Sequence, residues 1–421
     1  MTDGTAEHRG RMATQPIWVL GGARTDFARN LTREGVGFDG LCAEVVADAL
    51  ADAGVRAADV ETVHVANAFG QLFTGQGHLG AMPATVEPDL AGRPAVRHEA
   101  ACASGSTAIL AAMAELEAGR HDTALVVGLE LERTVEGDVA AQHLGAASWV
   151  GHEGSPRYVW PAAFSEVAEE YDRRYGIDDA HLHAFAELAF ANAKDDPNAQ
   201  TREWRFGPDS FTDDDRANPV IEGRTRRNDC SQVTDGGAAV VLATEAWVRD
   251  HPAVARHGRA ARIVGWGHRT VALPLASKLA GSRGDTHVMP HVRDTFADAL
   301  GRAGLATVDD LDAVEVHDCF SASGYLAIDH TGITAPGDSW KAIESGEIAR
   351  DGRLPVNPGG GLIGGGHPVG ATGVRMAVDA LRQVTDTAGA TQVGGARRVG
   401  TLNIGGSTAT CCSLIVEAAP S

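Results

Sequence analysis

Short apolar runs alternate along the chain with longer stretches in which apolar residues recur every three or four positions. The runs are typical of buried strands and the stretches are typical of helices. Strands are predicted at residues 17–20, 60–65, 124–129, 238–242, 261–264 and 311–316, and helices at residues 38–53, 105–116, 164–175 and 179–193. Gly54 follows the first helix and is a suitable C-terminal stop. The alternation predicts an α/β fold.

Two features organise this pattern. From about residue 133 to 220 it gives way to a charged segment with three tryptophans, which we interpret as a loop domain inserted into the first half. The motif ADALADAG at residues 47–54 returns as ADALGRAG at residues 297–304. Each copy precedes a polar turn and a strand, and each half later places a reactive residue, Cys102 or His367, at the start of a helix of small residues. The shared order predicts two duplicated α/β halves stacked face to face.

The repeat also sets the predicted domain boundaries. Residues 1–13 are polar and are predicted to be a flexible extension, the first half occupies residues 14–260, and the second half occupies residues 261–421. The extension lacks the apolar core of a signal peptide, and no apolar run reaches the roughly 18 residues of a membrane-spanning helix. We therefore expect a cytoplasmic protein without a membrane span.

The charge and the cysteine content of the chain exclude some classes of binding partner. Among the 421 residues, 56 are acidic and 36 are basic, which gives a formal net charge of −20. This charge repels phosphates, so we expect neither nucleic acid nor an anionic membrane as a partner. The six cysteines include no Cys-x-x-Cys pair. Their spacing argues against a structural zinc site, suits a reducing compartment and leads us to expect no bound metal.

Cys102 stands immediately before a predicted helix of small residues. The partial positive charge at a helix N-terminus favours a thiolate and lowers the pKa of such a thiol. The neighbours Ala101 and Ala103 leave room for a substrate. These features favour a nucleophile. The alternative is a buried structural cysteine, because unpaired cysteines are among the most buried residues.

A glycine-rich segment surrounds His367. Eight of the fifteen residues from 359 to 373 are glycine, which costs backbone entropy and implies a close approach to the backbone. The segment matches neither the lysine-containing phosphate loop nor the dinucleotide-binding glycine pattern. His367, followed by Pro368, instead presents an imidazole that can act as general base to a thiol. A flexible surface loop with an incidental histidine is the alternative.

Two further segments place polar groups at the ends of strands. His317, Asp318 and Cys319 follow a predicted strand, a placement typical of sites in α/β proteins. Alternatively, Cys319 belongs to the core and Asp318 caps the next helix. Near the C-terminus, Gly405 and Gly406 can present backbone N–H groups to an oxyanion, or they form an ordinary tight turn.

Six segments occur in an order shared with one enzyme family. They are Arg24-Thr25-Asp26-Phe27, the Cys102 segment, Asp235-Gly236-Gly237-Ala238-Ala239, His317-Asp318-Cys319-Phe320, Gly366-His367-Pro368-Val369-Gly370-Ala371-Thr372-Gly373 and the final glycine turn. From about residue 15 to 418 the chain resembles the thiolases, in particular the sterol-carrier-protein-type thiolases and bacterial acetyl-CoA acetyltransferases. The resemblance implies a duplicated fold with a five-layered α-β-α-β-α core, an inserted loop domain, and a homodimer or a dimer of dimers.

The resemblance also implies roles for the reactive residues. Cys102 becomes the acylated nucleophile and His367 the base that activates it. His317 stands where many thiolases have asparagine, and with His367 it would line a first oxyanion hole, acting through a bound water. The backbone N–H groups of Cys102 and Gly405 would form the second oxyanion hole.

Two positions depart from the commonest thiolase pattern. The terminal Cys-x-Gly loop, whose cysteine is the second acid–base group in most members, has Asn403 instead, and an amide cannot take a proton from a substrate α-carbon. In the sterol-carrier-protein-type branch the thiol of the His-Asp-Cys-Phe motif takes that role, so Cys319 inherits it. Residues 158–161, Tyr-Val-Trp-Pro, replace a His-Met pair near the substrate, which leaves the acyl specificity open.

The implied reaction is ping-pong acyl transfer between a 3-ketoacyl-CoA and CoA, through an acyl-Cys102 intermediate. Cys319 protonates the departing acetyl-CoA carbanion in thiolysis, or deprotonates acetyl-CoA in the reverse Claisen condensation. CoA and acyl-CoA are substrates, and no permanently bound cofactor is implied. We expect the densest basic cluster, Arg224, Arg226 and Arg227, to meet a CoA phosphate, and a solvated charge cluster is the alternative.

Thiolysis is favourable when CoA is abundant, so we expect a role in lipid metabolism, in β-oxidation of fatty acids or sterol side chains. Two alternatives are a C-acyltransferase or condensing enzyme of secondary metabolism, and a thiolase-like subunit that depends on a small partner protein to hold acyl-CoA. A third is a retro-aldolase relative. Cys102 argues against the third, because we expect such relatives to lack the nucleophile.

Overall fold

The computed structural model describes residues 15–154, 156–255 and 260–420. The flexible extension predicted at residues 1–13 therefore lies outside the described residues. The strands of the described part are β1 (Ile17–Arg24), β2 (Thr62–Ala66), β3 (Ala95–His98), β4 (Thr123–Glu130), β5 (Val220–Glu222), β6 (Thr225–Arg226), β7 (Gly236–Ala243), β8 (Ala261–Thr270), β9 (Ala313–Val316), β10 (Arg398–Gly405) and β11 (Thr410–Ala418).

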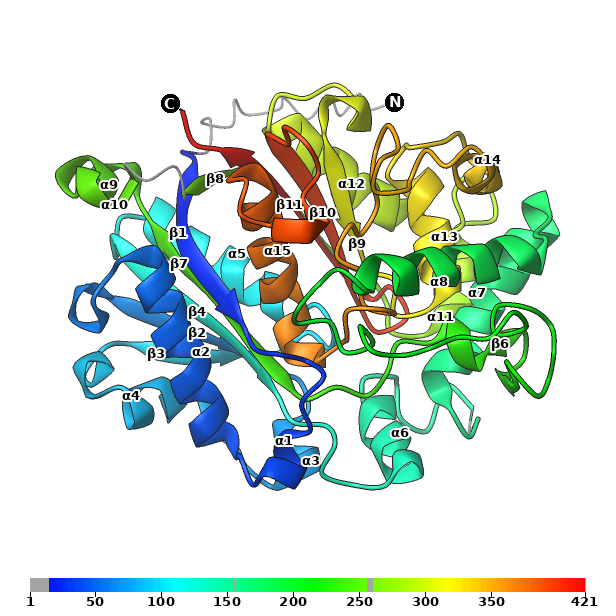
Figure 1. The fold of residues 1–421 in the computed structure, drawn as a ribbon, viewed down its shortest axis with the longest axis horizontal. Coiled ribbons are helices and arrows are strands. Elements are labelled where there is room, and N and C mark those ends of the chain that lie inside the picture. The colour runs from blue at the N-terminus through cyan, green and yellow to red at the C-terminus, as the bar shows by residue number, and fades with distance from the viewer. Residues whose placement is uncertain (1–14, 155, 256–259, 421) are drawn as a thin grey trace, which may run out of the picture.

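Helices connect these strands and cover their faces (Figure 1). They are α1 (Leu31–Glu34), α2 (Phe38–Ala53), α3 (Gly70–Thr74), α4 (Met82–Val86), α5 (Ser104–Glu117), α6 (Gly137–Gly145), α7 (Val159–Tyr175), α8 (Asp179–Ala193), α9 (Glu245–Asp250), α10 (Pro252–Ala255), α11 (Leu275–Gly281), α12 (Pro290–Arg302), α13 (Ser321–His330), α14 (Ser339–Glu344) and α15 (Thr372–Val384). Over the described residues, none of these helices has the length and hydropathy needed to cross a membrane.

The strand order repeats between the two halves. Nine strands follow the order β3-β2-β4-β7-β1-β8-β11-β10-β9, and β5 and β6 form a separate hairpin. In the first block β2 runs parallel to β4, and the antiparallel strands β7 and β1 follow. In the second block β9 runs parallel to β10, and the antiparallel strands β11 and β8 follow. The same order with the same relative directions confirms the predicted duplication.

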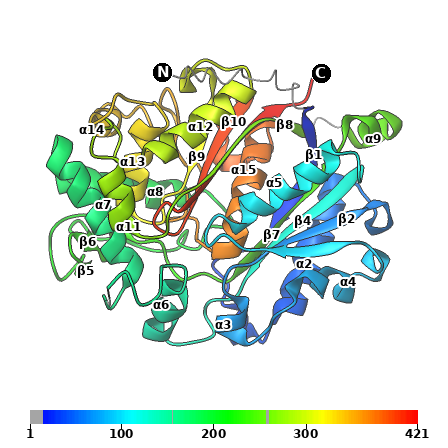
Figure 2. The ribbon, with the colours of Figure 1, turned by 180° about the vertical axis from the view of Figure 1, so that it is seen from behind.

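The blocks and helices stack in five layers. Helices α5 and α15 lie side by side in the centre, and one apolar cluster joins them to both blocks (Figures 1 and 2). Helix α2 covers the outer face of the first block, and α12 and α13 cover the outer face of the second. The α-β-α-β-α arrangement implied by the resemblance is confirmed.

The two central helices approach closely because each has a glycine at the contact. A Cβ on Gly105 would lie 2.6 Å from a backbone nitrogen of α15, and a Cβ on Gly373 would lie 2.2 Å from the backbone nitrogen of Ser106. Real Cβ atoms do not approach that closely, so no larger residue fits without movement. The contact brings together the N-terminal ends of both helices, and with them Cys102 and His367.

The segment predicted as a loop domain contains α6, α7 and α8, and the β5–β6 hairpin begins at its predicted end. Although it lies within the first half of the sequence, α7 and α8 pack against α13 of the second half. It therefore bridges both halves beside their junction. The first block of strands ends at Ala243 and the second begins at Ala261. The predicted boundaries near residues 133, 220 and 260 remain predictions.

Candidate active site

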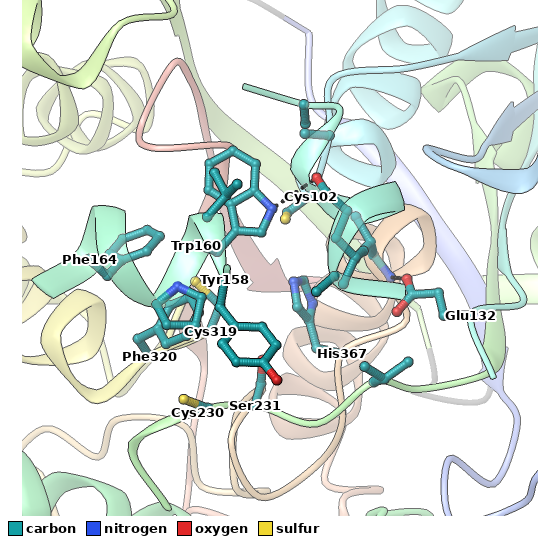
Figure 3. Close-up of a pocket in the computed structure, with 18 of the residues that line it drawn as sticks. Cys102, Glu132, Tyr158, Trp160, Phe164, Cys230, Ser231, Cys319, Phe320 and His367 are labelled. Carbon is teal, nitrogen blue, oxygen red and sulfur yellow. Dashed lines mark hydrogen bonds between the residues drawn. The ribbon is translucent and has the colours of Figure 1, made fainter. Parts of the chain in front are cut away.

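A mainly apolar cavity of about 210 Å³ lies between α6, α7 and the junction of the two halves (Figure 3). Its aromatic lining consists of Phe69, Tyr158, Trp160, Phe164 and Phe320. Cys102, Cys319 and His367 line the same cavity. The structure thus brings together three residues that the sequence had identified from motifs far apart.

Cys102 follows a strained residue in a tight turn. Ala101 has a φ of 51°, in the left-handed region that side chains rarely adopt. The Ser104 hydroxyl secures this turn, because it donates to the Ala101 carbonyl at 2.6 Å and accepts from the Ala100 N–H at 2.9 Å. Helix α5 begins only after the turn, at Ser104, so the thiol projects into the cavity ahead of the helix.

The Cys102 thiol is neutral near pH 7. We expected the helix end to lower the pKa of Cys102, whereas burial, with the nearby Glu132 carboxyl, raises this pKa to about 12. The backbone N–H of Gly406 donates to the sulfur and offsets part of the rise. Attack on a substrate therefore requires a base that removes the thiol proton.

His367 presents a nitrogen suited to that task. Its Nδ1 lies 2.7 Å from the Thr372 hydroxyl oxygen, and this hydroxyl donates its only proton to the Pro368 carbonyl at 2.9 Å. Nδ1 must therefore carry the proton of the imidazole, and Nε2 presents a lone pair. Burial, aided by Arg375, lowers the pKa of His367 to about 3, so the ring is neutral near pH 7.

The glycine-rich segment is packed inside the protein, and residues 360–378 are buried. Asp318 secures it by accepting a hydrogen bond from the Leu362 N–H at 2.7 Å. A Cβ on Gly361 would lie 2.4 Å from the same carboxylate, which accounts for a glycine there. Asp318 thus anchors the His367 segment, and it does not cap α13, whose N-cap is Phe320.

The second thiol and the second imidazole lie close to the nucleophile. Burial, with Cys102 nearby, raises the pKa of Cys319 well above its usual value, so this thiol carries a proton. The His317 ring lies 5.2 Å from the His367 ring, nearly perpendicular to it. One ligand atom each of Cys102, His317 and His367 lies within 4.8 Å of the others. Two imidazoles and a thiol can also hold zinc, and our expectation of no metal remains a prediction.

The final glycine turn packs against the turn that holds Cys102. A Cβ on Gly405 would lie 2.2 Å from the Ala100 carbonyl oxygen, so only glycine allows this approach. Gly406, with a φ of 60°, lines the cavity. Both glycines thus lie beside the nucleophile, and the assignment of the Gly405 N–H to the second oxyanion hole remains a prediction.

The predicted CoA-binding arginines do not line the cavity. Arg224 and Arg226 each form ion pairs with two aspartates of the loop domain. Arg227 is exposed and donates to a backbone carbonyl. Two of the three charges are therefore neutralised within the chain, and a role for the cluster in binding CoA remains a prediction.

The sequence analysis missed Glu132. This residue lines the cavity and accepts a hydrogen bond from the Val369 N–H at 2.9 Å. Burial and the neighbouring Glu130 raise the pKa of Glu132 well above its usual value. The sequence did contain a signal for it, since Glu130 and Glu132 are two positions apart at the end of a strongly apolar strand. Residues two apart in extended backbone share one face, and acids rarely lie buried without a role.

Fold and site together define a class of enzyme built from two duplicated α/β halves, with two cysteines and a histidine at one cavity. Two family models match the sequence: the thiolase N-terminal domain over residues 17–204 and the thiolase C-terminal domain-like model over residues 277–418. The chain belongs to the thiolase family, as its motifs had indicated, and it is a thiolase-type acyltransferase.

Relatives that match more than nine-tenths of this chain agree with this assignment. The chain is 31% identical over 395 residues to acetyl-CoA acetyltransferase of Methanothermobacter thermautotrophicus, covering 94% of this chain and 97% of the relative. It is 27% identical to sterol carrier protein 2 of Gallus gallus, covering 92% of this chain and 69% of the relative.

Solved structures show the same fold at lower identity. An Ltp2-ChsH2(DUF35) aldolase is similar with a TM-score of 0.76 and 21% identity, over 97% of this chain and 99% of that chain. Acetyl-CoA acetyltransferase from Syntrophomonas wolfei is similar with a TM-score of 0.67 and 18% identity, over 97% of this chain and 100% of that chain.

Proposed function

We propose that the protein transfers acyl groups between a 3-ketoacyl-CoA and CoA through an acyl-Cys102 thioester. The meeting of Cys102, His367 and Cys319 at one apolar cavity carries the proposal. The reaction runs as thiolysis that releases acetyl-CoA, or in reverse as a Claisen condensation. A covalent intermediate divides one difficult step into two easier ones.

In the first step the Cys102 sulfur attacks the keto carbon while His367 Nε2 takes the thiol proton. A thiol with a pKa of about 12 and an imidazole with a pKa of about 3 do not exchange the proton beforehand. Proton transfer therefore accompanies attack. The keto oxygen carries the developing negative charge and becomes the thioester oxygen of the acyl-enzyme, so the backbone N–H groups of Cys102 and Gly405 stabilise it in both states. His317 and His367 stabilise the enolate oxygen of the departing acetyl-CoA.

Cys319 acts on the carbon that departs. When the carbon–carbon bond breaks, its electron pair goes to the α-carbon of acetyl-CoA, and the protonated Cys319 thiol supplies a proton there. The Cys319 thiolate then takes the proton of a second CoA thiol, whose sulfur attacks the acyl-Cys102 thioester, and the Cys102 sulfur leaves as a thiolate that regains its proton from His367 Nε2. In the condensation direction Cys319 removes the α-proton instead.

The proposal also covers the substrates, the oligomeric state, the location and the metabolic role of the protein. CoA and acyl-CoA are substrates, no cofactor is permanently bound, and Arg227 is the member of the basic cluster that is available to a CoA phosphate. We include a homodimer or a dimer of dimers in the cytoplasm, and a role in lipid breakdown by β-oxidation. The exposed edge strand β3, where Val96 is 45% exposed, supports an interface between chains.

A thiolase-like subunit that works with a small partner protein is the second candidate. The internal pairing of Arg224 and Arg226 favours it, because two of the three arginines expected to meet an anionic CoA are neutralised by aspartates in a chain with a net charge of −20. The similar solved structure named Ltp2-ChsH2(DUF35) aldolase pairs a chain of this fold with a second protein. Activity that appears only after a partner is added would favour this candidate.

A panel of 3-ketoacyl-CoA substrates tests the proposal, with thiolysis followed by absorbance and acyl-enzyme by intact mass. Cys102→Ala should form no acyl-enzyme. Cys319→Ala should still be acylated by an acyl-CoA, but thiolysis should fall by about 10²- to 10⁴-fold. Cys42→Ala, a buried thiol of α2 outside the cavity, is the control and should keep wild-type rates. Full thiolysis by Cys319→Ala would contradict its assigned role, and no acylation of the wild type by any substrate would refute the proposal.

A further inference from the structure

Asn403 lies fully buried between the central helix α5 and the imidazole of His317. Its amide oxygen accepts a hydrogen bond from the Ser106 hydroxyl at 2.9 Å, and its amide nitrogen lies 3.1 Å from His317 Nδ1. A Cβ on Gly373 would lie 2.6 Å from the amide oxygen, so α15 closes over the group and limits its movement. In this orientation the carboxamide presents its NH₂ group to His317.

This orientation determines where His317 carries its proton. An amide NH₂ can only donate, so His317 Nδ1 must accept and cannot carry a proton. Burial, with the neighbouring His367 and Arg375, lowers the pKa of His317 well below its usual value, so the ring is neutral. A neutral imidazole with a bare Nδ1 has its proton on Nε2.

One nitrogen of the His317 ring lies within 4.8 Å of the Cys102 sulfur and of a nitrogen of His367. The ring nitrogen that Asn403 does not contact is Nε2. It is buried and has no hydrogen-bond partner among the described residues. The titratable groups around this ring are Cys102 from the turn before α5, His367 from the glycine-rich segment and Arg375 of α15. A buried N–H donor without a protein partner, beside a nucleophilic sulfur, is suited to a developing oxyanion.

The two neighbouring imidazoles thus carry their protons on different ring nitrogens. Thr372 fixes His367 with a bare Nε2 that accepts a proton, whereas Asn403 fixes His317 with a protonated Nε2 that donates a hydrogen bond. Acyl transfer needs one group of each kind at the nucleophile. The residue that replaces the usual second acid–base cysteine therefore contributes through its neighbour.

We propose that Asn403 is a positioning residue that holds His317 in the Nε2–H form and so provides the donor that stabilises the oxyanion. This inference rests on the proposed acyl transfer. It assigns Asn403 no contact with the substrate and no proton transfer. Its effect should appear in the rate of acylation and in the dependence of that rate on pH, and the KM should change little.

Asn403→Asp keeps the size of the side chain but should move the proton of His317 from Nε2 to Nδ1. An ionised carboxylate only accepts, so Nδ1 of His317 must carry a proton, and the neutral ring then presents a lone pair at Nε2. Acylation at neutral pH should fall by about 10²- to 10³-fold, the usual cost of losing one oxyanion donor. At lower pH the ring gains a second proton and Nε2–H returns, so the rate should recover as pH falls. The wild type should show no such recovery.

Two further variants separate positioning from folding. Asn403→Leu fills the space without hydrogen bonds and should slow acylation without creating the new pH dependence. Ser413→Ala, on the adjacent strand β11, removes a buried hydroxyl that has no partner among the described residues, and it should behave as the wild type. Thermal unfolding should confirm that each variant folds.

A measurement independent of activity is the ¹⁵N shift pattern of the His317 ring, assigned by its absence in His317→Gln. The wild type should show a protonated Nε2 and a bare Nδ1, and Asn403→Asp should show a protonated Nδ1. A protonated Nδ1 in the wild type would overturn the inference, and so would Asn403→Asp with the wild-type rate and pH profile. If the wild type forms no acyl-enzyme while the ring shows the expected pattern, the proposed function fails and the assigned tautomer stands.

Discussion

At the scale of single residues, the site is built from buried neutral groups. The Cys102 thiol and the His367 imidazole are both uncharged, because burial opposes the thiolate and the imidazolium alike. Motifs identified Cys102, His317, Cys319 and His367, since each lies in a recognisable local sequence. They did not identify Glu132, because its approach to the cavity depends on which strand end lies beside the Val369 segment.

The buried imidazole makes stability depend on pH. The folded pKa of His367 is about 3, below the ordinary value of about 6.5, so between these values the unfolded chain binds more protons. This residue therefore reduces the free energy of unfolding as pH falls below 6.5, by up to about 1.4 kcal/mol per pH unit. His367→Gln removes this contribution. In urea unfolding, the free energy of unfolding of the variant relative to that of the wild type should therefore be roughly 1 kcal/mol higher at pH 5.5 than at pH 7.5.

The matched control is His152→Gln, which changes an exposed histidine outside the cavity lining. It should keep a constant difference from the wild type at both pH values. A His367→Gln variant that loses stability in parallel with the wild type would contradict the assigned burial of the ring.

At the scale of elements, periodicity located most helices and strands. The helices predicted at residues 38–53 and 179–193 have the bounds of α2 and α8. The first strand extends past its predicted end at Leu20 to Arg24. Gly21 lies within it, where α2 approaches closely: a Cβ there would lie 2.4 Å from the backbone nitrogen of Ala53. The edge strand β3 was missed, since its exposed residues lack the apolar pattern of a buried strand.

The contact of α5 with α15 should depend on Gly105. Gly105→Ala introduces a Cβ that meets the backbone of α15, and overpacking of this kind costs about 1–3 kcal/mol. Because Cys102 and His367 lie just before the N-terminal ends of these helices, acylation should slow as well. Thermal unfolding and intact-mass acylation kinetics measure the two effects.

Gly301→Ala provides the comparison. Gly301 lies within α12, and a Cβ there would meet nothing within 4 Å. Alanine favours a helix over glycine by roughly 0.5–1 kcal/mol, so this variant should be as stable as the wild type or more stable, with unchanged acylation. Equal behaviour of the two alanine variants would show that the helix contact tolerates a side chain.

At the scale of the whole molecule, the repeated motif and the spacing of the reactive residues were enough to predict two stacked halves. The docking of α7 and α8 on the second half was not predicted, because it joins segments more than a hundred residues apart through contacts that leave no local pattern. The charge of −20 is likewise a property of the entire chain. It opposes the approach of any anionic substrate.

The overall charge should govern the encounter with CoA. Salt shortens the Debye length from about 30 Å at 0.01 M to about 8 Å at 0.15 M, which screens the repulsion between like charges. We therefore expect kcat/KM for CoA to rise over this range of ionic strength, with kcat nearly constant. Pantetheine, a thiol substrate without phosphates, should show little change. A fall in kcat/KM for CoA would mean that local cations, Arg227 among them, outweigh the overall charge.

The placement of α15 also bears on how the chain folds during its synthesis. This helix covers the inner faces of β1 and β7, and its residues Val374, Val378 and Leu381 pack in the same apolar cluster as Val240 and Leu242. These strands leave the ribosome well before α15 does. A newly made first half therefore exposes an apolar surface until the last part of the chain arrives, and exposed surfaces of this kind bind chaperones or aggregate. Production of the protein will depend on protecting that face while the chain is incomplete.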